Sequence, residues 1–330
     1  MKFQTYAELR RENSDAPTAW AVFGPDDEVG TLNFLTPAHV VTAREEIIEG
    51  VVINLDLALD AFTPSLIPTR GAPVHHLFAN NEFHRDEYLD GFYTQSSSQI
   101  DGFRHIGHPT LGFYQGSDGE EFHAGTPRLG VNRFAERGIV GRGVLVDVAR
   151  YRASIGRPID HAAAEVFPIS DVADAAASQG VVFADGDILL LRTGWISHHA
   201  VERRQAGAAS GEPFRASGLA ASHETLEWLW DHRFSVVATD NFAVEAWPAP
   251  ENSPLLSGAE QRGELERSNH SGLMHRVMIP LLGMVLGELW DLDALADLSA
   301  ADDRWTCMVV ASPLNLTGGA GSPANAVAIR

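Results

Sequence analysis

The sequence has almost no cysteine and no long apolar run. Its single cysteine, Cys307, lies in the apolar run Cys307-Met308-Val309-Val310, so no intrachain disulfide is possible and a thiolate metal site is not expected. The thiol is expected to pack as a small hydrophobe. No stretch approaches the roughly 20 apolar residues that a membrane-spanning helix needs, and the N-terminal segment has no apolar signal region. These absences predict a soluble, cytoplasmic protein with no membrane partner.

Basic residues are also scarce. The chain has 24 Lys and Arg against 44 Asp and Glu, a formal charge of −20, which argues against binding to nucleic acid or to an anionic membrane. The 330 residues are 45% hydrophobic, enough for a large buried core. Because no stretch has the composition of a linker, we expect a single domain over residues 1–330. A small molecule is the expected partner, although the composition does not identify it.

Short apolar runs bounded by turn residues predict the fold class. Five of them favour strands buried on both faces: Val51–Leu55, Gly143–Val148, Asp187–Arg192, Ser235–Thr239 and Met308–Ala311. Helical patterns lie between the strands, at Thr36–Gly50, Ser170–Gly180 and Ser222–His232. Strands and helices alternate from about residue 140, which is typical of an α/β fold.

Two stretches show little periodicity, residues 60–135 and 248–271. The first is rich in Gly, Pro, His, Asn and aromatic residues. Long irregular segments in a domain are usually functional. His75, His76 and His84 fall in this stretch and either reach a cleft or lie on ordinary surface loops.

The run Gln99-Ile100-Asp101-Gly102-Phe103-Arg104-His105 is the first candidate half-site. In an extended segment, Gln99, Asp101 and His105 would point to one face, together with Phe103. An amide, a carboxylate and an imidazole on one face would suit Zn or Mn. The alternative is that Asp101 caps the turn at Gly102 and that His105 is only hydrogen-bonded.

A second candidate half-site combines His275 and Glu288. We expect a short helix from Ser271 through Met278, then a short strand over Met284–Leu286 that Glu288 follows. Glu288 stands among apolar residues, and an unpaired buried carboxylate is costly, so it needs a metal, a cation or a strong donor. An ordinary buried ion pair is the alternative. Asp240 and Glu245 follow a predicted buried strand, which is a common place for a binding site.

These fragments occur in the order and spacing of a known family. Its marks here are Gln99 to His105, Gly143-Val144-Leu145-Val146-Asp147, Gly186-Asp187-Ile188-Leu189, Asp240-Asn241, His275 with Leu281-Leu282-Gly283 and Glu288, and Gly318-Gly319-Ala320-Gly321-Ser322-Pro323. With these marks, from about Gly30 to the C-terminus, the chain resembles the metal-dependent cyclase-like hydrolases, the family of bacterial kynurenine formamidase and isatin hydrolase. The resemblance implies a mixed, barrel-like β-sheet with flanking helices, and a homodimer or homotetramer.

The resemblance also implies roles for single residues. Asp101, His275 and Glu288 match the metal ligands of the family, and His105 matches the last histidine of its HxGTHxDxxxH motif, either a ligand or the general base. Gln95 and Gln99 stand where that motif has its first two histidines. This departure, which larger members of the family share, predicts one Mn or Zn ion rather than two, with Gln99 a weak ligand.

The resulting hypothesis is a hydrolase that cleaves an amide or lactone of a small cyclic or aromatic substrate with metal-activated water. Arg104 would orient the substrate, and Phe103 and Trp247 would contact it, together with Phe113 and Tyr114. Two alternatives stay open: a non-catalytic binding protein with an eroded metal site, and a metal-assisted cyclase or dehydratase.

Overall fold

The computed structural model describes residues 3–14, 16–206 and 214–330. Its central feature is a nine-stranded sheet, in the order β1-β13-β11-β5-β7-β9-β10-β4-β12. The strands are β1 (Val52–Asn54), β2 (Val74–Asn81), β3 (His84–Asp90), β4 (Gln99–Asp101), β5 (Ile139–Asp147), β6 (Val166–Phe167), β7 (Ile188–Arg192), β8 (Gly218–Leu219), β9 (Val236–Thr239), β10 (Val285–Glu288), β11 (Thr306–Ala311), β12 (Gly321–Pro323) and β13 (Ala326–Ile329).

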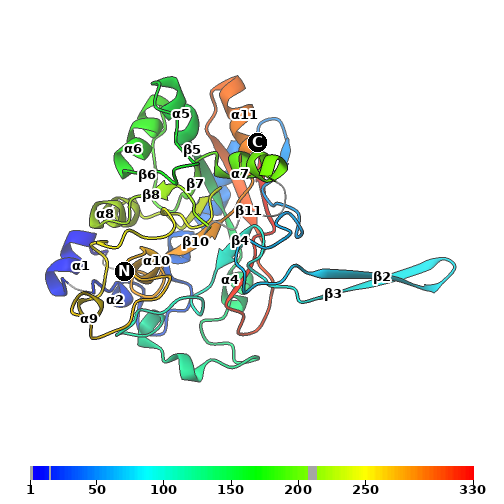
Figure 1. The fold of residues 1–330 in the computed structure, drawn as a ribbon. Coiled ribbons are helices and arrows are strands. Elements are labelled where there is room, and N and C mark those ends of the chain that lie inside the picture. The colour runs from blue at the N-terminus through cyan, green and yellow to red at the C-terminus, as the bar shows by residue number, and fades with distance from the viewer. Residues whose placement is uncertain (1–2, 15, 207–213) are drawn as a thin grey trace.

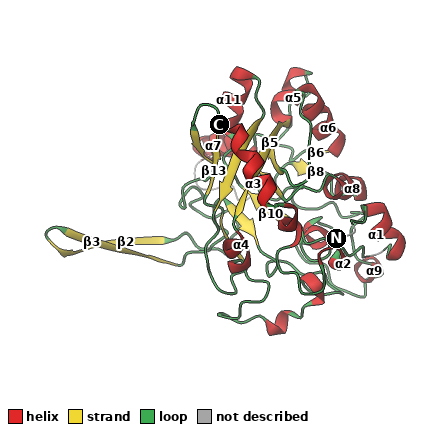
Figure 2. Cartoon of the chain, turned by 180° about the vertical axis from the view of Figure 1, so that it is seen from behind, coloured by secondary structure: helices red, strands yellow, loops and turns green. Residues whose placement is uncertain are grey.

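Helices cover this sheet (Figures 1 and 2). The α-helices are α1 (Tyr6–Glu12), α2 (Trp20–Phe23), α3 (Pro37–Ala43), α4 (Asn132–Arg137), α5 (Val148–Ser154), α6 (Ile169–Ser178), α7 (Trp195–Ala206), α8 (His223–Asp231), α9 (Gly258–Gln261), α10 (His275–Met278) and α11 (Asp293–Asp302). The 3-10 helices are η1 (Gly30–Phe34), η2 (Arg44–Glu46), η3 (Tyr114–Gly116) and η4 (Gly119–Glu121).

The sheet is mixed. Strands β5, β7, β9 and β10 run parallel in its middle, and the strands on either side pair antiparallel. It curls into a half-barrel flanked by helices, which confirms the predicted fold class. All five predicted strands are present, and β7 shows why the runs are continuous, since its first four residues are buried. The assignment of one domain stays a prediction.

The predicted helices are present with shifted ends. Helix α8 begins as expected, with the Ser222 hydroxyl accepting from the backbone N–H of Thr225 at 3.1 Å. Helix α3 starts at Pro37 after the N-cap Thr36 but ends at Ala43, well before Gly50, because a 3-10 turn follows it. Helix α10 begins at His275 and not near Ser271.

The stretch 60–135 contains regular structure that the sequence did not predict. Strands β2 and β3 form an antiparallel hairpin that stands clear of the body of the molecule in both views (Figures 1 and 2). His75, His76 and His84 lie on this hairpin, and none of them lines either of the two cavities described below for the described residues.

Among the residues that the structure describes, no helix combines the length and the apolar character that crossing a membrane requires.

Candidate metal centre

Two antiparallel strands position the carboxylates of the centre. In the β4–β10 ladder, Glu288 lies opposite Gln99 and Leu286 lies opposite Asp101. Because side chains two residues apart share a face of a strand, Gln99 and Asp101 point the same way, and Glu288 joins them from the neighbouring strand. The pairing register therefore brings together residues that are almost 190 positions apart in sequence.

His275 completes a three-residue cluster from the first turn of α10. Its Nε2 lies 2.8 Å from Glu288 Oε1 and 3.7 Å from Asp101 Oδ2. One ligand atom from each of Asp101, His275 and Glu288 lies within 4.8 Å of the other two, and all three residues are buried. An imidazole with two carboxylates is a donor set that suits Zn or Mn.

Unused acceptors at this cluster show that its residues fit a cation. Among the residues that the structure describes, no donor reaches Asp101 Oδ2, and the side-chain oxygen of Gln99 is also without a donor. The Asp101 side chain is fully buried. A buried carboxylate oxygen without a partner is costly, and a metal ion between Asp101, His275 and Glu288 would remove that cost.

Glu245 orients the imidazole from its other side. Glu245 Oε1 lies 2.8 Å from His275 Nδ1 and also accepts from the backbone N–H of His275 at 3.1 Å. This contact leaves Nε2 facing Asp101 and Glu288, as a metal-binding histidine requires. Burial lowers the pKa of His275, but the Glu245 and Glu288 carboxylates outweigh it and hold that pKa well above its ordinary value. Burial and the charge of Asp101 raise the pKa of Glu288 to about 7.

A turn, and not an extended strand, brings His105 to the cluster. Strand β4 ends at Asp101, and the N–H of His105 donates to the Gly102 carbonyl at 3.0 Å. The chain thus folds back and places His105 Nε2 3.9 Å from Asp101 Oδ2. Burial lowers the pKa of His105, although Asp101 opposes the effect. A neutral imidazole at this position can accept a proton.

The two glutamines hold the carboxylates. Gln95 Nε2 donates to Asp101 Oδ1 at 2.5 Å, and Gln99 Nε2 donates to Glu288 Oε2 at 2.5 Å. Both amides therefore lie at the cluster, where the resemblance placed them. Ligation of a metal by Gln99 stays a prediction.

Four of the five residues predicted to contact substrate do not line the cavity beside the cluster: Arg104, Phe103, Phe113 and Tyr114. The Arg104 guanidinium donates to the backbone carbonyls of Arg128 and Thr126 at 2.8 Å and lies over the Phe122 ring. Phe103 is fully buried and packs against Tyr114 and Phe134 in the core. The alternation that was expected to bring Phe103 to the face of the cluster ends with the strand at Asp101, and the Phe103 ring packs into the core instead.

A cavity of about 220 Å³ opens next to the cluster. Its lining in the described chain includes His105, His275, Gln99 and Glu288, with Ile67, Thr69, Arg70, Ile106, Phe242, Ala243, Trp247, Asn269, His270 and Leu273. Trp247, predicted to contact substrate, is on this wall, and Phe242 meets it edge to face at 5.4 Å. A larger cavity of about 410 Å³, lined by Arg10, Glu260 and Arg276 among others, does not include the cluster.

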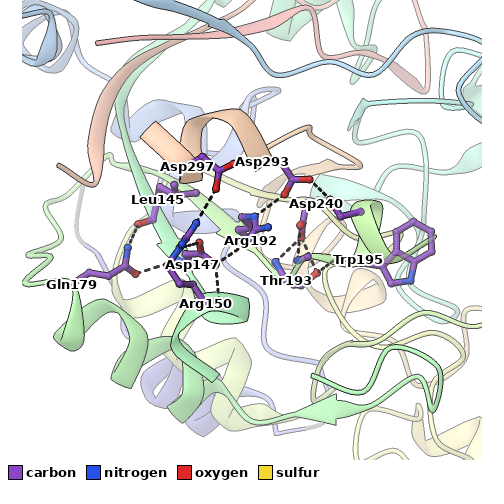
Figure 3. Close-up of polar contacts among 12 residues, drawn as sticks. Leu145, Asp147, Arg150, Gln179, Arg192, Thr193, Trp195, Asp240, Asp293 and Asp297 are labelled. Atoms are coloured by element: carbon purple, nitrogen blue, oxygen red, sulfur yellow. Dashed lines mark hydrogen bonds and ion pairs between the residues drawn. The ribbon is translucent and has the colours of Figure 1, made fainter. Parts of the chain in front are cut away.

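Asp240 lies at the ends of the parallel strands, where its carboxylate holds the backbone that follows β7 (Figure 3). Its carboxylate accepts from the backbone N–H groups of Thr193 and Gly194 at 2.6 and 2.7 Å. Next to it, Arg192 contacts Asp147 at 2.9 Å and Asp293 at 2.8 Å. This strand-end network occupies the edge of the sheet where α/β proteins usually bind ligands. The candidate centre lies beside it, at the end of the parallel strand β10, where Glu288 also pairs with Gln99 of the antiparallel strand β4.

Comparison with known proteins decides the family. The model of the family described as "Putative cyclase" matches residues 53–246. The chain belongs to this cyclase family. The match spans β4, His105 and Glu245, whereas His275 and Glu288 lie beyond it.

Solved structures of cyclase-family proteins agree with this assignment. The structure of a novel cyclase superposes with a TM-score of 0.77 and 26% identity, covering 95% of this chain and 99% of its own. Isatin hydrolase A from Labrenzia aggregata, bound to benzyl benzoate, gives a TM-score of 0.55 at 16% identity over 84% of this chain and 93% of its own. Isatin hydrolase A from Ralstonia solanacearum gives a TM-score of 0.55 at 16% identity, covering 90% of this chain and 98% of its own. The last two show the fold. No curated protein matches the chain.

The sequence did not point to some of the cavity residues of this cyclase-family protein. Arg70 and His270 lie in the two stretches that have no periodic pattern, and only their place in those stretches pointed to them. Phe242 directly follows Asp240-Asn241. The sequence pointed to this segment through Asp240, but the side chain that lines the cavity is that of Phe242. The contact of Glu245 with His275 depends on the path of residues 248–271, for which the sequence offered no signal.

Proposed function

We propose that this cyclase-family protein is a metal-dependent hydrolase that opens an amide or lactone bond of a small cyclic or aromatic molecule. The observation that supports it most is the buried cluster of Asp101, His275 and Glu288, with its unpartnered Asp101 oxygen, beside an aromatic-walled cavity. The fold shared with isatin hydrolases agrees with hydrolysis.

Asp101, His275 and Glu288 would hold Mn or Zn. When bound, the ion would act as a Lewis acid on the substrate carbonyl and would lower the pKa of water. His105, which burial keeps neutral, accepts the proton of the attacking water and returns it to the leaving nitrogen or oxygen. Gln95 keeps Asp101 in place through its amide hydrogen bond.

The cavity wall favours a flat substrate. Trp247 and Phe242 present an aromatic corner, and Leu273 and Ile67 add apolar surface. Arg70 lines the same cavity, where its guanidinium donates to the backbone carbonyl of Gln95, and it would bind the carboxylate that hydrolysis of an amide or lactone produces. In this proposal Arg70, and not Arg104, would orient the substrate.

The test combines metal analysis with turnover. Protein purified without chelators is analysed for Mn and Zn, then assayed with isatin, aryl formamides and lactones. We expect about one ion per chain, loss of both metal and turnover in Asp101→Ala, and loss of turnover with metal retained in His105→Gln. His84→Gln, on the exposed hairpin, is the matched control and should resemble the wild type. No metal after incubation with Mn and Zn, or full turnover in Asp101→Ala, would overturn the proposal.

One observation favours a second candidate, a binding protein with an eroded metal site. The Gln95 and Gln99 amides already donate hydrogen bonds to one carboxylate oxygen each of Asp101 and Glu288, so these two oxygens have partners without a metal. A protein of this kind would bind a flat ligand in the cavity without metal and without turnover. A third, a metal-assisted cyclase or dehydratase, needs the same metal but forms no hydrolysis product, so mass analysis of the products separates it.

A further inference from the structure

The cavity of about 410 Å³ is separate from the one beside the metal centre, and residues of α1, α9 and α10 line it. Helices α1 and α9 are neighbours in both views of the fold (Figures 1 and 2). The cavity has the size of a pocket for a small organic molecule. The proposed hydrolysis makes no use of it.

Positive charge exceeds negative charge in this cavity. Among the described residues that line it, there are three arginines against a single acidic residue: Arg10, Arg262, Arg276 and Glu260. This surplus occurs in a chain whose formal charge is −20. A hollow lined by charges of one sign concentrates ions of the opposite sign, so the cavity favours an anion.

Arg10 is the arginine without a partner for its charge. Arg276 Nη1 lies 2.6 Å from Glu260 Oε1, and Arg262 pairs with a glutamate outside the cavity at 2.7 Å. Among the residues that the structure describes, no carboxylate pairs with Arg10, and its Nε is buried without an acceptor. A partly buried charge without a counter-charge is costly. A bound anion would remove that cost.

The carboxylate of Glu260 is not free to neutralise Arg10. Besides Arg276, it accepts from the backbone N–H of Ser257 at 2.9 Å, from the Ser257 hydroxyl at 2.8 Å and from the Ser271 hydroxyl. A carboxylate has about four acceptor sites, and these four donors fill them. The counter-charge for Arg10 must therefore come from outside the described chain.

Two histidines of the cavity add evidence for a positive potential. Burial, and then the charge of Arg276, lower the pKa of His108 to about 4. Burial, and then the charge of Arg10, lower the pKa of His223. The backbone N–H of Thr110 donates to His108 Nδ1 at 3.3 Å, so the neutral ring carries its proton on Nε2. His108 thus supplies an N–H donor of the kind that an anion needs.

We propose that this cavity binds a small organic acid whose carboxylate or phosphate group pairs with Arg10. The planar fork of a guanidinium matches both of these groups. Leu255, Leu256 and Val277 give the same cavity an apolar wall. This wall suits the body of an organic acid and offers nothing to a bare inorganic ion.

The test is isothermal titration calorimetry of the full chain with phthalate, phenyl phosphate and inorganic phosphate. We expect an organic acid to bind, with an affinity that falls as NaCl is added. Inorganic phosphate should bind at least about tenfold more weakly, because it leaves the apolar wall uncovered. Arg10→Met should weaken binding of the organic acid by about 10–100-fold. The tighter of the two organic acids identifies the anionic group.

Arg11→Met is the matched control, because Arg11 is the next residue of α1, is exposed and does not line the cavity. Arg70→Met changes the cavity beside the metal centre. The site that depends on Arg10 should persist in both variants, and circular dichroism should show that all variants are folded.

Several results would overturn the proposal. They are no binding of either organic acid at millimolar concentration, wild-type affinity in Arg10→Met, an equal loss in Arg11→Met, and inorganic phosphate that binds as tightly as the organic acids. Loss of all binding in Arg70→Met would place the ligand in the other cavity and would also overturn it. The titration involves no turnover, so its result is independent of the proposed function.

Discussion

Replacing Glu245 tests how the imidazole of the candidate metal centre is held. Glu245 is fully buried, and its Oε1 is the acceptor for both the ring Nδ1 and the backbone N–H of His275. In Glu245→Ala these two donors lose their acceptor, and the ring can turn its Nε2 away from Asp101 and Glu288. Loss of such a supporting contact weakens metal binding by about 10–100-fold, or about 1.4–2.7 kcal/mol. Two unsatisfied buried donors also cost about 1–3 kcal/mol each in stability.

The assay is a competition titration of Mn or Zn against a chromophoric chelator, with circular dichroism to show that the variant is folded. Glu245→Gln keeps an oxygen for Nδ1–H, so it should lose less than tenfold. Glu264→Ala removes an exposed glutamate paired with Arg262 and should bind metal as the wild type does. A folded Glu245→Ala protein with wild-type affinity would refute the reasoning, because His275 would then need no support or would not be a ligand.

Three further predictions concern the scaffold. Arg192→Met should lower the free energy of unfolding by about 3–5 kcal/mol in urea titrations, because Asp147 stays buried and loses a partner; a loss below about 1 kcal/mol would contradict this. Burial raises the pKa of Asp56 to about 6 in the folded chain, above its ordinary 3.8. The folded state therefore binds the Asp56 proton more tightly than the unfolded state does. The stabilisation from this proton is full below pH 3.8 and is lost as the pH rises through 6. The stability of the wild type relative to Asp56→Asn should therefore fall by about 1–2 kcal/mol over that range, after allowance for partial exposure, and a flat difference would be contrary evidence. Burial raises the pKa of Cys307 to about 12, so a thiol reagent at neutral pH should label it only in denaturant, and rapid native labelling would show the burial to be wrong.

The sequence predicted those elements whose side chains face a core on both sides. Strand β7 is an example, because burial of both faces leaves a continuous apolar run. The hairpin was missed for the opposite reason. Neither face of β2 packs against the body, so Val74 to Asn81 shows no alternation of apolar and polar residues. Helix ends were less certain than helix cores, as the early stop at Ala43 shows.

The candidate site was predicted in part. Asp101, His275 and Glu288 lie together as expected, but the approach of His105 was derived from an extended strand that in fact ends at Asp101. The structure directs the Arg104 side chain toward the backbone carbonyls of Arg128 and Thr126 and away from the cavity, so its predicted contact with substrate stays a prediction. Contacts such as that of Glu245 with His275 depend on the path of an irregular segment, and local periodicity contains no information about such a path.

The strand-end network of Arg192, Asp147 and Asp240 has a consequence for how this fold can change (Figure 3). The residues that keep the parallel strands together are not those that line the cavity. Substitution at Trp247 or Phe242 can therefore alter the shape available to a substrate while the ion pairs of the scaffold stay intact. The stability of the fold and the substrate specificity of the cavity can therefore change independently. A library of variants substituted only at the cavity wall should contain a high fraction of folded proteins.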